Sequence, residues 1–132
     1  ESVKKEYIEK NPLKVFETVY NIIEDRKNNP KEGSYTNYLF DKGIDKMCKK
    51  VGEEAAEVII AAKNRSVDEV TYEVADLFFH VLVVMKETGV VPDDIFTELQ
   101  KRRAQKNLTF RLKFSIIVYY AREECHQYET AA

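Results

Sequence analysis

The chain has 132 residues, of which 44% are hydrophobic and 33% are charged, and its formal net charge at pH 7 is −2. This length and the low content of glycine and proline favour one mostly helical domain over an all-β fold. The charge balance gives no reason to expect nucleic-acid binding, and no apolar run is long enough to span a membrane. Cys48 and Cys125 have no metal-ligand spacing and the N-terminus is polar, so we expect a cytoplasmic protein with reduced thiols.

Composition and periodicity divide the chain into three parts. Residues 1–10 are charged, which predicts a linker or a disordered N-terminus. Residues 11–106 carry helical patterns and predict one helical domain, and residues 107–132 form a C-terminal extension of unknown role. Apolar residues in the extension alternate at strand period and also fit one helix face, so its structure stays open. A lone strand would need a partner edge, which makes pairing with another chain one alternative.

Two helices are predicted in the first half of the domain. Asn11-Pro12 is typical of an N-cap and first helical residue, so a helix is expected over residues 12–28. A loop over residues 31–36 follows, and then a longer helix over residues 37–63. The apolar stripe of this longer helix places one cysteine in the core and consists of Ile44, Met47, Cys48, Val51, Ala55, Val58, Ile59 and Ala62.

Two further helices are predicted in the second half. The capping box Ser66-x-x-Glu69 begins the third helix, and Gly89 ends it. Its apolar stripe is Val70, Val74, Leu77, Val81 and Met85. Pro92 with two following acids begins the fourth helix. Three aromatic residues of the third helix are expected to pack, with a subunit interface as one alternative: Tyr72, Phe78 and Phe79.

Two pairs of acids at spacing i, i+3 carry the main functional signal. Glu54 and Glu57 share one face of the second helix, and Glu73 and Asp76 share one face of the third. Residues 61–66 can reverse the chain, so the two helices would present four acids to each other. Such a cluster is costly without a partner, and a set of carboxylates selects a hard cation, Mg²⁺ or Mn²⁺. Mg²⁺ commonly binds with substrate phosphates, which favours a phosphate ester or anhydride as the substrate.

A plainer interpretation of these acids is a solvated surface with ordinary ion pairs. Glu53 lies four residues after Lys49, and Glu54 four residues after Lys50, which is the spacing of helical salt bridges. Glu57 has no cationic neighbour at this spacing, and neither has Glu73. Acids at the margin of a core need a partner, which favours the cation site.

Other candidates lie around the acids. Four lysines before them could meet substrate phosphate, or could be ordinary solvated lysines: Lys42, Lys46, Lys49 and Lys50. The loop residues Ser34, Tyr35 and Thr36 could bind an anion at a helix start, with a capping turn as the alternative. His80 lies one turn after Asp76 and is either a packed histidine or a substrate contact.

Taken together, these motifs resemble the phosphoribosyl-ATP pyrophosphatase family. The resemblance rests on Gly33 to Thr36 (GSYT), Lys46 to Lys63 (KMCKKVGEEAAEVIIAAK) and Tyr72 to Leu77 with His80, in this order, and it covers residues 13–103. The family belongs to the all-α nucleotide pyrophosphohydrolases, whose signature is ExxE followed by ExxD. The matching residues in this chain are Glu54, Glu57, Glu73 and Asp76.

The resemblance implies a fold and an activity. We expect an antiparallel helical bundle completed by dimerisation, which hydrolyses phosphoribosyl-ATP to phosphoribosyl-AMP and pyrophosphate with Mg²⁺ in histidine biosynthesis. Glu54, Glu57, Glu73 and Asp76 would hold the metal, and Glu53 or Glu54 would act as general base. Many members are fused to phosphoribosyl-AMP cyclohydrolase, so a chain without an initial Met could be part of such a fusion. The alternatives are a house-cleaning nucleoside triphosphate pyrophosphohydrolase and a non-catalytic helical dimerisation module.

Overall fold

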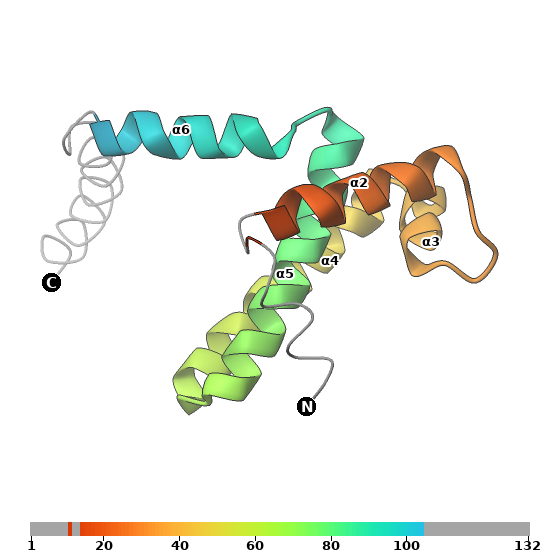
Figure 1. Cartoon of the computed structure of the whole chain (residues 1–132). Helices are drawn as coiled ribbons and strands as arrows, with labels where there is room; N and C mark the ends of the chain where they lie inside the picture. Colours follow the sequence, from red (N-terminus) through yellow and green to blue (C-terminus); the bar gives the residue numbers. More distant parts are fainter. Residues whose placement is uncertain (1–10, 12–13, 105–132) are drawn as a thin grey trace, which may run out of the picture. The chain divides into compact units, whose positions relative to one another are not determined.

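Helices make up all the secondary structure in the described part of the chain (Figure 1). The computed structural model describes residue 11 and residues 14–104. Its elements are α2 (Lys14–Asn28), α3 (Tyr35–Lys42), α4 (Ile44–Asn64), α5 (Val67–Thr88) and α6 (Pro92–Ala104). The all-α prediction is therefore confirmed, whereas the expectations for residues 1–10, for Pro12 and for residues 107–132 lie outside the described residues. None of the described helices is long and apolar enough to cross a membrane.

Helices α4 and α5 form the antiparallel pair that the sequence predicts (Figure 1). Helix α4 ends at Asn64 and is capped by Arg65, which has a left-handed backbone (φ 55°). The Arg65 amide donates to the carbonyl groups of Ala61 and Ala62. The next residue, Ser66, is the N-cap of α5, and its hydroxyl accepts a hydrogen bond from the Glu69 amide at 3.3 Å. The predicted start of this helix at the Ser66 cap is confirmed, whereas the Ser66 amide donates to Ala61 and not to Glu69. The short reversal places the acidic faces of the two helices side by side.

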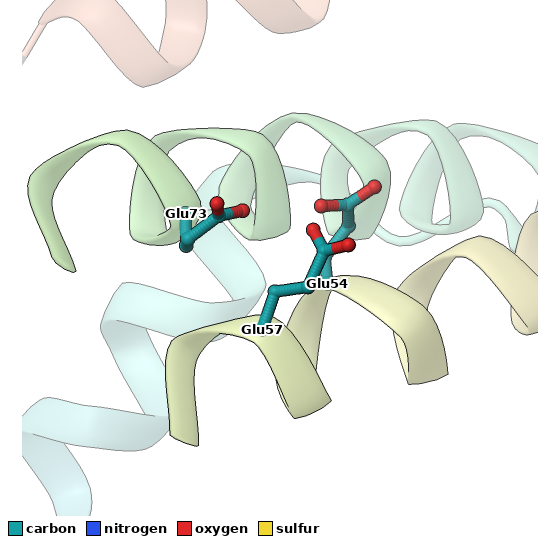
Figure 2. A group of neighbouring side chains, drawn as sticks. All are labelled: Glu54, Glu57 and Glu73. Carbon is teal, nitrogen blue, oxygen red and sulfur yellow. The ribbon is translucent and has the colours of Figure 1, made fainter. Parts of the chain in front are cut away.

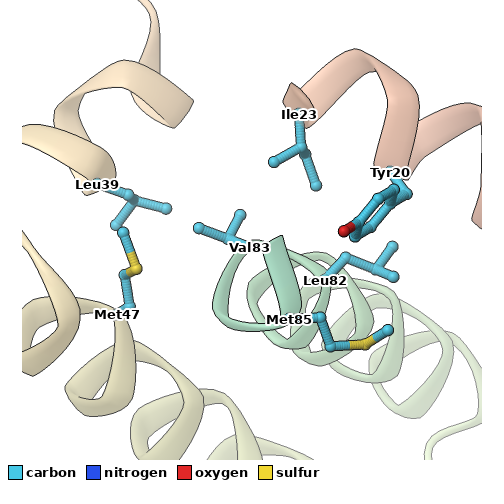
Figure 3. Close-up of a cluster of buried hydrophobic side chains, with 7 residues drawn as sticks. All are labelled: Tyr20, Ile23, Leu39, Met47, Leu82, Val83 and Met85. Carbon is cyan, nitrogen blue, oxygen red and sulfur yellow. The ribbon is translucent and has the colours of Figure 1, made fainter. Parts of the chain in front are cut away.

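The hydrophobic core lies where α5 meets the three helices before it (Figure 3). Helix α5 contacts α2, α3 and α4, so a broad arc of its surface is covered. The core residues are Tyr20, Ile23, Leu39, Met47, Leu82, Val83 and Met85. Because the four helices share this core, the position of the acidic face of α5 relative to α4 is fixed by packing rather than by the acids themselves.

Five members of the predicted apolar stripes are exposed: Ile44, Cys48, Ile59, Ala62 and Val81. Cys48 was expected in the core, and Val81 is 36% exposed. In their place Leu82 and Val83 are buried, because α5 is covered from several sides and its buried arc is wider than one stripe. Among the described residues, α4 is covered on the face toward α3 and α5, and Ile59 is 65% exposed.

The single helix predicted over residues 37–63 was also wrong, because the chain breaks at Gly43. Gly43 has φ 82° and ψ −175°, a conformation that is essentially restricted to glycine, and it separates α3 from α4. Helix α3 also begins earlier than expected, at Tyr35, with Ser34 as its N-cap. Gly43 therefore sets the angle at which α3 leaves the acid-bearing helix.

Substitution of two glycines by alanine should have effects of opposite sign. Gly43→Ala should cost about 1–3 kcal/mol of unfolding free energy, because alanine strongly disfavours this backbone conformation. Gly52→Ala, within α4, should stabilise by about 0.5–1 kcal/mol, because an added Cβ there meets no atom within 4 Å. Urea unfolding followed by circular dichroism measures both, and a neutral Gly43→Ala would contradict the need for glycine at the break.

Helix α6 belongs to a second unit of the chain and is considered by itself. It begins at Pro92 with acids at Asp93 and Asp94 and ends with a cluster of basic residues, as the sequence predicts. An ion pair between Arg102 and Glu98 spans one turn at 2.8 Å. The predicted fourth helix is thus confirmed.

Candidate functional site

Three carboxylates from the α4–α5 pair converge on one point (Figure 2). Glu54 and Glu57 come from successive turns of α4, and Glu73 comes from α5. One oxygen from each lies within 4.8 Å of the others, a spacing that a single cation can bridge. Asp76, one turn further along α5, is not one of the three. The structure therefore brings together three of the four acids that the sequence singled out.

The negative charges of the cluster oppose one another at Glu57. Hydrogen bonding to Glu73 and to Glu54, together with their negative charge, raises the pKa of Glu57 above its ordinary value. The Oε2 atom of Glu73 is buried and has no hydrogen-bond partner among the described residues. A buried carboxylate oxygen without a partner is costly, and a bound cation would satisfy it. The residues present therefore fit a hard divalent cation.

Lys50 supplies a positive charge to Glu54 and Glu53. Its Nζ atom lies 2.9 Å from Oε1 of Glu54 and 3.0 Å from Oε2 of Glu53. The hydrogen bond from Lys50 lowers the pKa of both glutamates, and these bonds raise the pKa of Lys50. Glu54, only 4% exposed, is therefore held as a carboxylate between Lys50 and the other acids.

Two of the remaining predicted lysines make longer contacts than Lys50 does. Lys49 Nζ lies 3.8 Å from Glu53 and its side chain is 67% exposed, which is the ordinary surface pair that the spacing allowed. The positive charge of Lys46 also lowers the pKa of Glu53, after the effects of Lys50 and Lys49. Lys42 lies over the ring of Tyr38, 5.8 Å from its centroid. These lysines lie on α3 and the first half of α4, before the acids in the chain.

His80 is buried beside the acids and links α5 to α3. Its Nδ1 atom lies 2.8 Å from the backbone oxygen of Asp76, and its Nε2 atom lies 3.0 Å from the hydroxyl of Tyr35. Oε1 of Glu54 is 3.8 Å from Nδ1, beyond hydrogen-bond distance. Burial raises the pKa of Tyr35 above its ordinary value, which keeps its hydroxyl protonated.

The predicted anion loop is a capping turn in this structure. The Ser34 hydroxyl accepts a hydrogen bond from the Asn37 amide at 3.3 Å, and Tyr35 and Thr36 lie in the first turn of α3. The sequence patterns indicated Tyr35 and His80 as separate candidates and gave no sign of the hydrogen bond between them. No local signal could have paired residues 45 positions apart, because the pairing depends on the break at Gly43.

Comparisons with known proteins agree on one family. Residues 16–103 match the model of the family described as phosphoribosyl-ATP pyrophosphohydrolase. A phosphoribosyl-ATP pyrophosphatase of Streptococcus thermophilus is 55% identical over 93 residues, which are 70% of this chain and 89% of that protein. One from Lactiplantibacillus plantarum is 58% identical over 90 residues, covering 68% of this chain and 85% of its own.

A longer relative has the same region as part of a larger protein. The histidine biosynthesis bifunctional protein HisIE of Thermoanaerobacter pseudethanolicus is 59% identical over 85 residues, which are 64% of this chain. The matched region spans only 39% of that relative. The four acids and the lysines before them all lie within residues 16–103, the part that matches the family.

Proposed function

Because the chain belongs to the phosphoribosyl-ATP pyrophosphohydrolase family, we propose that it hydrolyses phosphoribosyl-ATP to phosphoribosyl-AMP and pyrophosphate in histidine biosynthesis. This reaction adds water across the phosphoric anhydride that joins the α- and β-phosphates. The observation that carries the proposal is the convergence of Glu54, Glu57 and Glu73 within the matched region. A triphosphate and a carboxylate cluster repel each other unless a cation lies between them.

The proposed cofactor is Mg²⁺, with Mn²⁺ as a substitute. Glu54, Glu57 and Glu73 would hold it. Asp76 lies outside this group and is proposed as a fourth ligand because it follows Glu73 at spacing i, i+3 on α5. Bound Mg²⁺ supplies positive charge that offsets the phosphate oxygens and the departing pyrophosphate. The unpartnered Oε2 of Glu73 supports this assignment.

The remaining acids and the lysines have separate proposed roles. Glu53 or Glu54 is proposed to accept the proton of the attacking water. The lowered pKa of each keeps it ionised at neutral pH and also makes it a weaker base than an ordinary glutamate. Lys50 keeps Glu54 charged and oriented through its 2.9 Å contact. Eight further residues from the loop, the lysines and one histidine are predicted to contact the substrate: Ser34, Tyr35, Thr36, Lys42, Lys46, Lys49, Lys50 and His80.

Pyrophosphate release is the direct test of this function. We expect release from phosphoribosyl-ATP with Mg²⁺ and none after chelation by EDTA, because the acid cluster repels an unneutralised triphosphate. Parallel assays with dATP, dCTP and dUTP test the house-cleaning alternative, which predicts that these substrates are preferred. A dimerisation module without activity would release no pyrophosphate, and Mg²⁺ would not raise its melting temperature.

We also propose that the active protein is a homodimer. Four large apolar side chains near the turn between α4 and α5 are strongly exposed: Ile59 (65%), Ile60 (60%), Val67 (78%) and Tyr72 (67%). A cluster of this kind is characteristic of a surface that a partner covers. Analytical ultracentrifugation that found only monomer at assay concentrations would contradict the dimer. The bifunctional relatives support the further expectation of a fused second enzyme, such as phosphoribosyl-AMP cyclohydrolase, in the full-length protein.

A further inference from the structure

The ring of His80 has a defined partner at each nitrogen. Nδ1 faces the carbonyl oxygen of Asp76 at 2.8 Å, and Nε2 faces the Tyr35 hydroxyl at 3.0 Å. The residue is only 5% exposed, and the ring of Phe79 lies edge-on to it at 5.2 Å. A side chain enclosed in this way has little freedom to turn.

These contacts determine which ring nitrogen carries the proton. A carbonyl oxygen only accepts, so Nδ1 must carry a hydrogen and donate it to Asp76. Nε2 of the neutral ring is then an acceptor, and the Tyr35 hydroxyl donates to it. The two hydrogen bonds form one directed chain, from the Tyr35 hydroxyl through the ring to the backbone of α5.

Helix α3 is held to its neighbours by different contacts, of which the Tyr35 hydroxyl makes one. Leu39 packs into the core, and the Asn37 side chain donates to the carbonyl of Arg26 in α2 at 2.5 Å. Within the described residues, the hydrogen bond from Tyr35 is the side-chain hydrogen bond that joins α3 to α5. It acts at the first residue of α3, one residue after the Ser34 cap.

We propose that Tyr35 and His80 form a positioning pair that holds the start of α3 against the acid-bearing helices in the geometry that binds substrate. The pair acts through α3 and needs no contact with the reacting atoms. This inference rests on the proposed function, because it assigns Ser34 to Thr36 to the substrate side of the site. Nδ1 of His80 lies 3.8 Å from Oε1 of Glu54, which places the pair at the edge of the cluster.

Tyr35→Phe should raise KM for phosphoribosyl-ATP by about 2- to 12-fold, the equivalent of one net hydrogen bond of about 0.5–1.5 kcal/mol. Its kcat should change less than about twofold, because loss of uniform binding leaves the chemical step unchanged. The matched control is Tyr38→Phe, also on α3, whose hydroxyl makes no hydrogen bond among the described residues. We expect this control to keep the KM of the wild type.

A purely structural role predicts a different result. It would lower the melting temperature and the active fraction, and so reduce apparent kcat at unchanged KM. That pattern, or equal KM values for Tyr35→Phe and the wild type, would overturn the proposal.

Long-range ¹H–¹⁵N spectra of the full chain provide a test that needs no activity. The chain has two histidines, and the signals that disappear in His80→Gln identify those of His80. We expect a protonated Nδ1 and an unprotonated Nε2, with the Nε2 signal shifted in Tyr35→Phe and unchanged in Tyr38→Phe. A His80 ring protonated at Nε2 alone would overturn the pair. If the wild type releases no pyrophosphate while the spectra agree, the proposed function fails and the hydrogen-bonded pair stands.

Discussion

Glu57→Gln should give a folded protein that is more stable than the wild type without Mg²⁺ and at least about 100-fold less active. The two effects have one cause. Glu57 is the acid whose pKa its neighbours Glu73 and Glu54 raise, so its negative charge is unfavourable in the native state. Glutamine removes that repulsion, and it also removes a proposed cation ligand.

The stabilisation should depend on pH in a definite direction. The native pKa of Glu57 lies above its ordinary value of 4.5, so the cost of its charge is present at neutral pH. As the pH falls through the raised pKa toward the ordinary value, wild-type Glu57 becomes protonated and the cost disappears. The advantage of Glu57→Gln in melting temperature should therefore shrink between neutral pH and about pH 4.

The control for Glu57→Gln is Asp68→Asn, which removes the same charge elsewhere. Asp68 lies in the first turn of α5, where a negative charge is favourable, so its removal should not stabilise. Mg²⁺ should raise the melting temperature of the wild type and of Asp68→Asn, and leave Glu57→Gln nearly unchanged. A folded Glu57→Gln with undiminished turnover would refute the role of the cluster. Asp76→Asn, assayed in parallel, determines whether the fourth acid is a ligand.

Sequence patterns located most of the site because its geometry is local. Spacing i, i+3 within α4 set Glu54 beside Glu57, and the Ser66 capping box set where α5 begins relative to the turn. Packing of α5 on the shared core then turns Glu73 toward the acids of α4. This is why three of the four expected acids converge, although the pattern alone could not show that Asp76 stays outside the group.

The parts that sequence reasoning missed depend on contacts between distant segments. The helix predicted over residues 37–63 ran through Gly43, although its apolar stripe began only at Ile44. The break between α3 and α4 was therefore missed, and with it the meeting of Tyr35 and His80. The exposure of Cys48 was also hidden, because periodicity defines an apolar face but not which neighbouring helix covers it.

Lys50→Met should lower the free energy of unfolding by roughly 2–3 kcal/mol without Mg²⁺. Its side chain is 22% exposed and that of Glu54 only 6%, so the substitution leaves a nearly buried carboxylate without its cation. A fully buried pair would cost more, and the partial exposure of Lys50 reduces the effect. Lys49→Met is the matched control, because its side chain is 67% exposed and lies 3.8 Å from Glu53. It should change stability by less than about 0.5 kcal/mol in the same urea titration.

Acid pH should remove the difference between Lys50→Met and the wild type. Lys50 lowers the native pKa of Glu54, so the stability from this pair is present above the ordinary value of 4.5 and is lost as the pH falls through the lowered pKa. The pKa of Lys50 itself is raised, so its contribution is fully present below its ordinary value of 10.5 and is lost as the pH rises through the higher native pKa. The stability loss in Lys50→Met should therefore be large at neutral pH and small in acid.

The double variant Lys50→Met/Glu54→Gln distinguishes two roles of Lys50, as the counter-charge of Glu54 or as a ligand of substrate phosphate. If the main role of Lys50 is to neutralise Glu54, removing both charges recovers part of the lost stability, because no unpaired carboxylate remains beside Glu57 and Glu73. If Lys50 binds substrate phosphate instead, Lys50→Met should raise KM with little loss of stability, and the double variant should recover no stability. The 2.9 Å contact and the burial of Glu54 favour the first result, since a lysine engaged by two carboxylates is already neutralised before substrate binds.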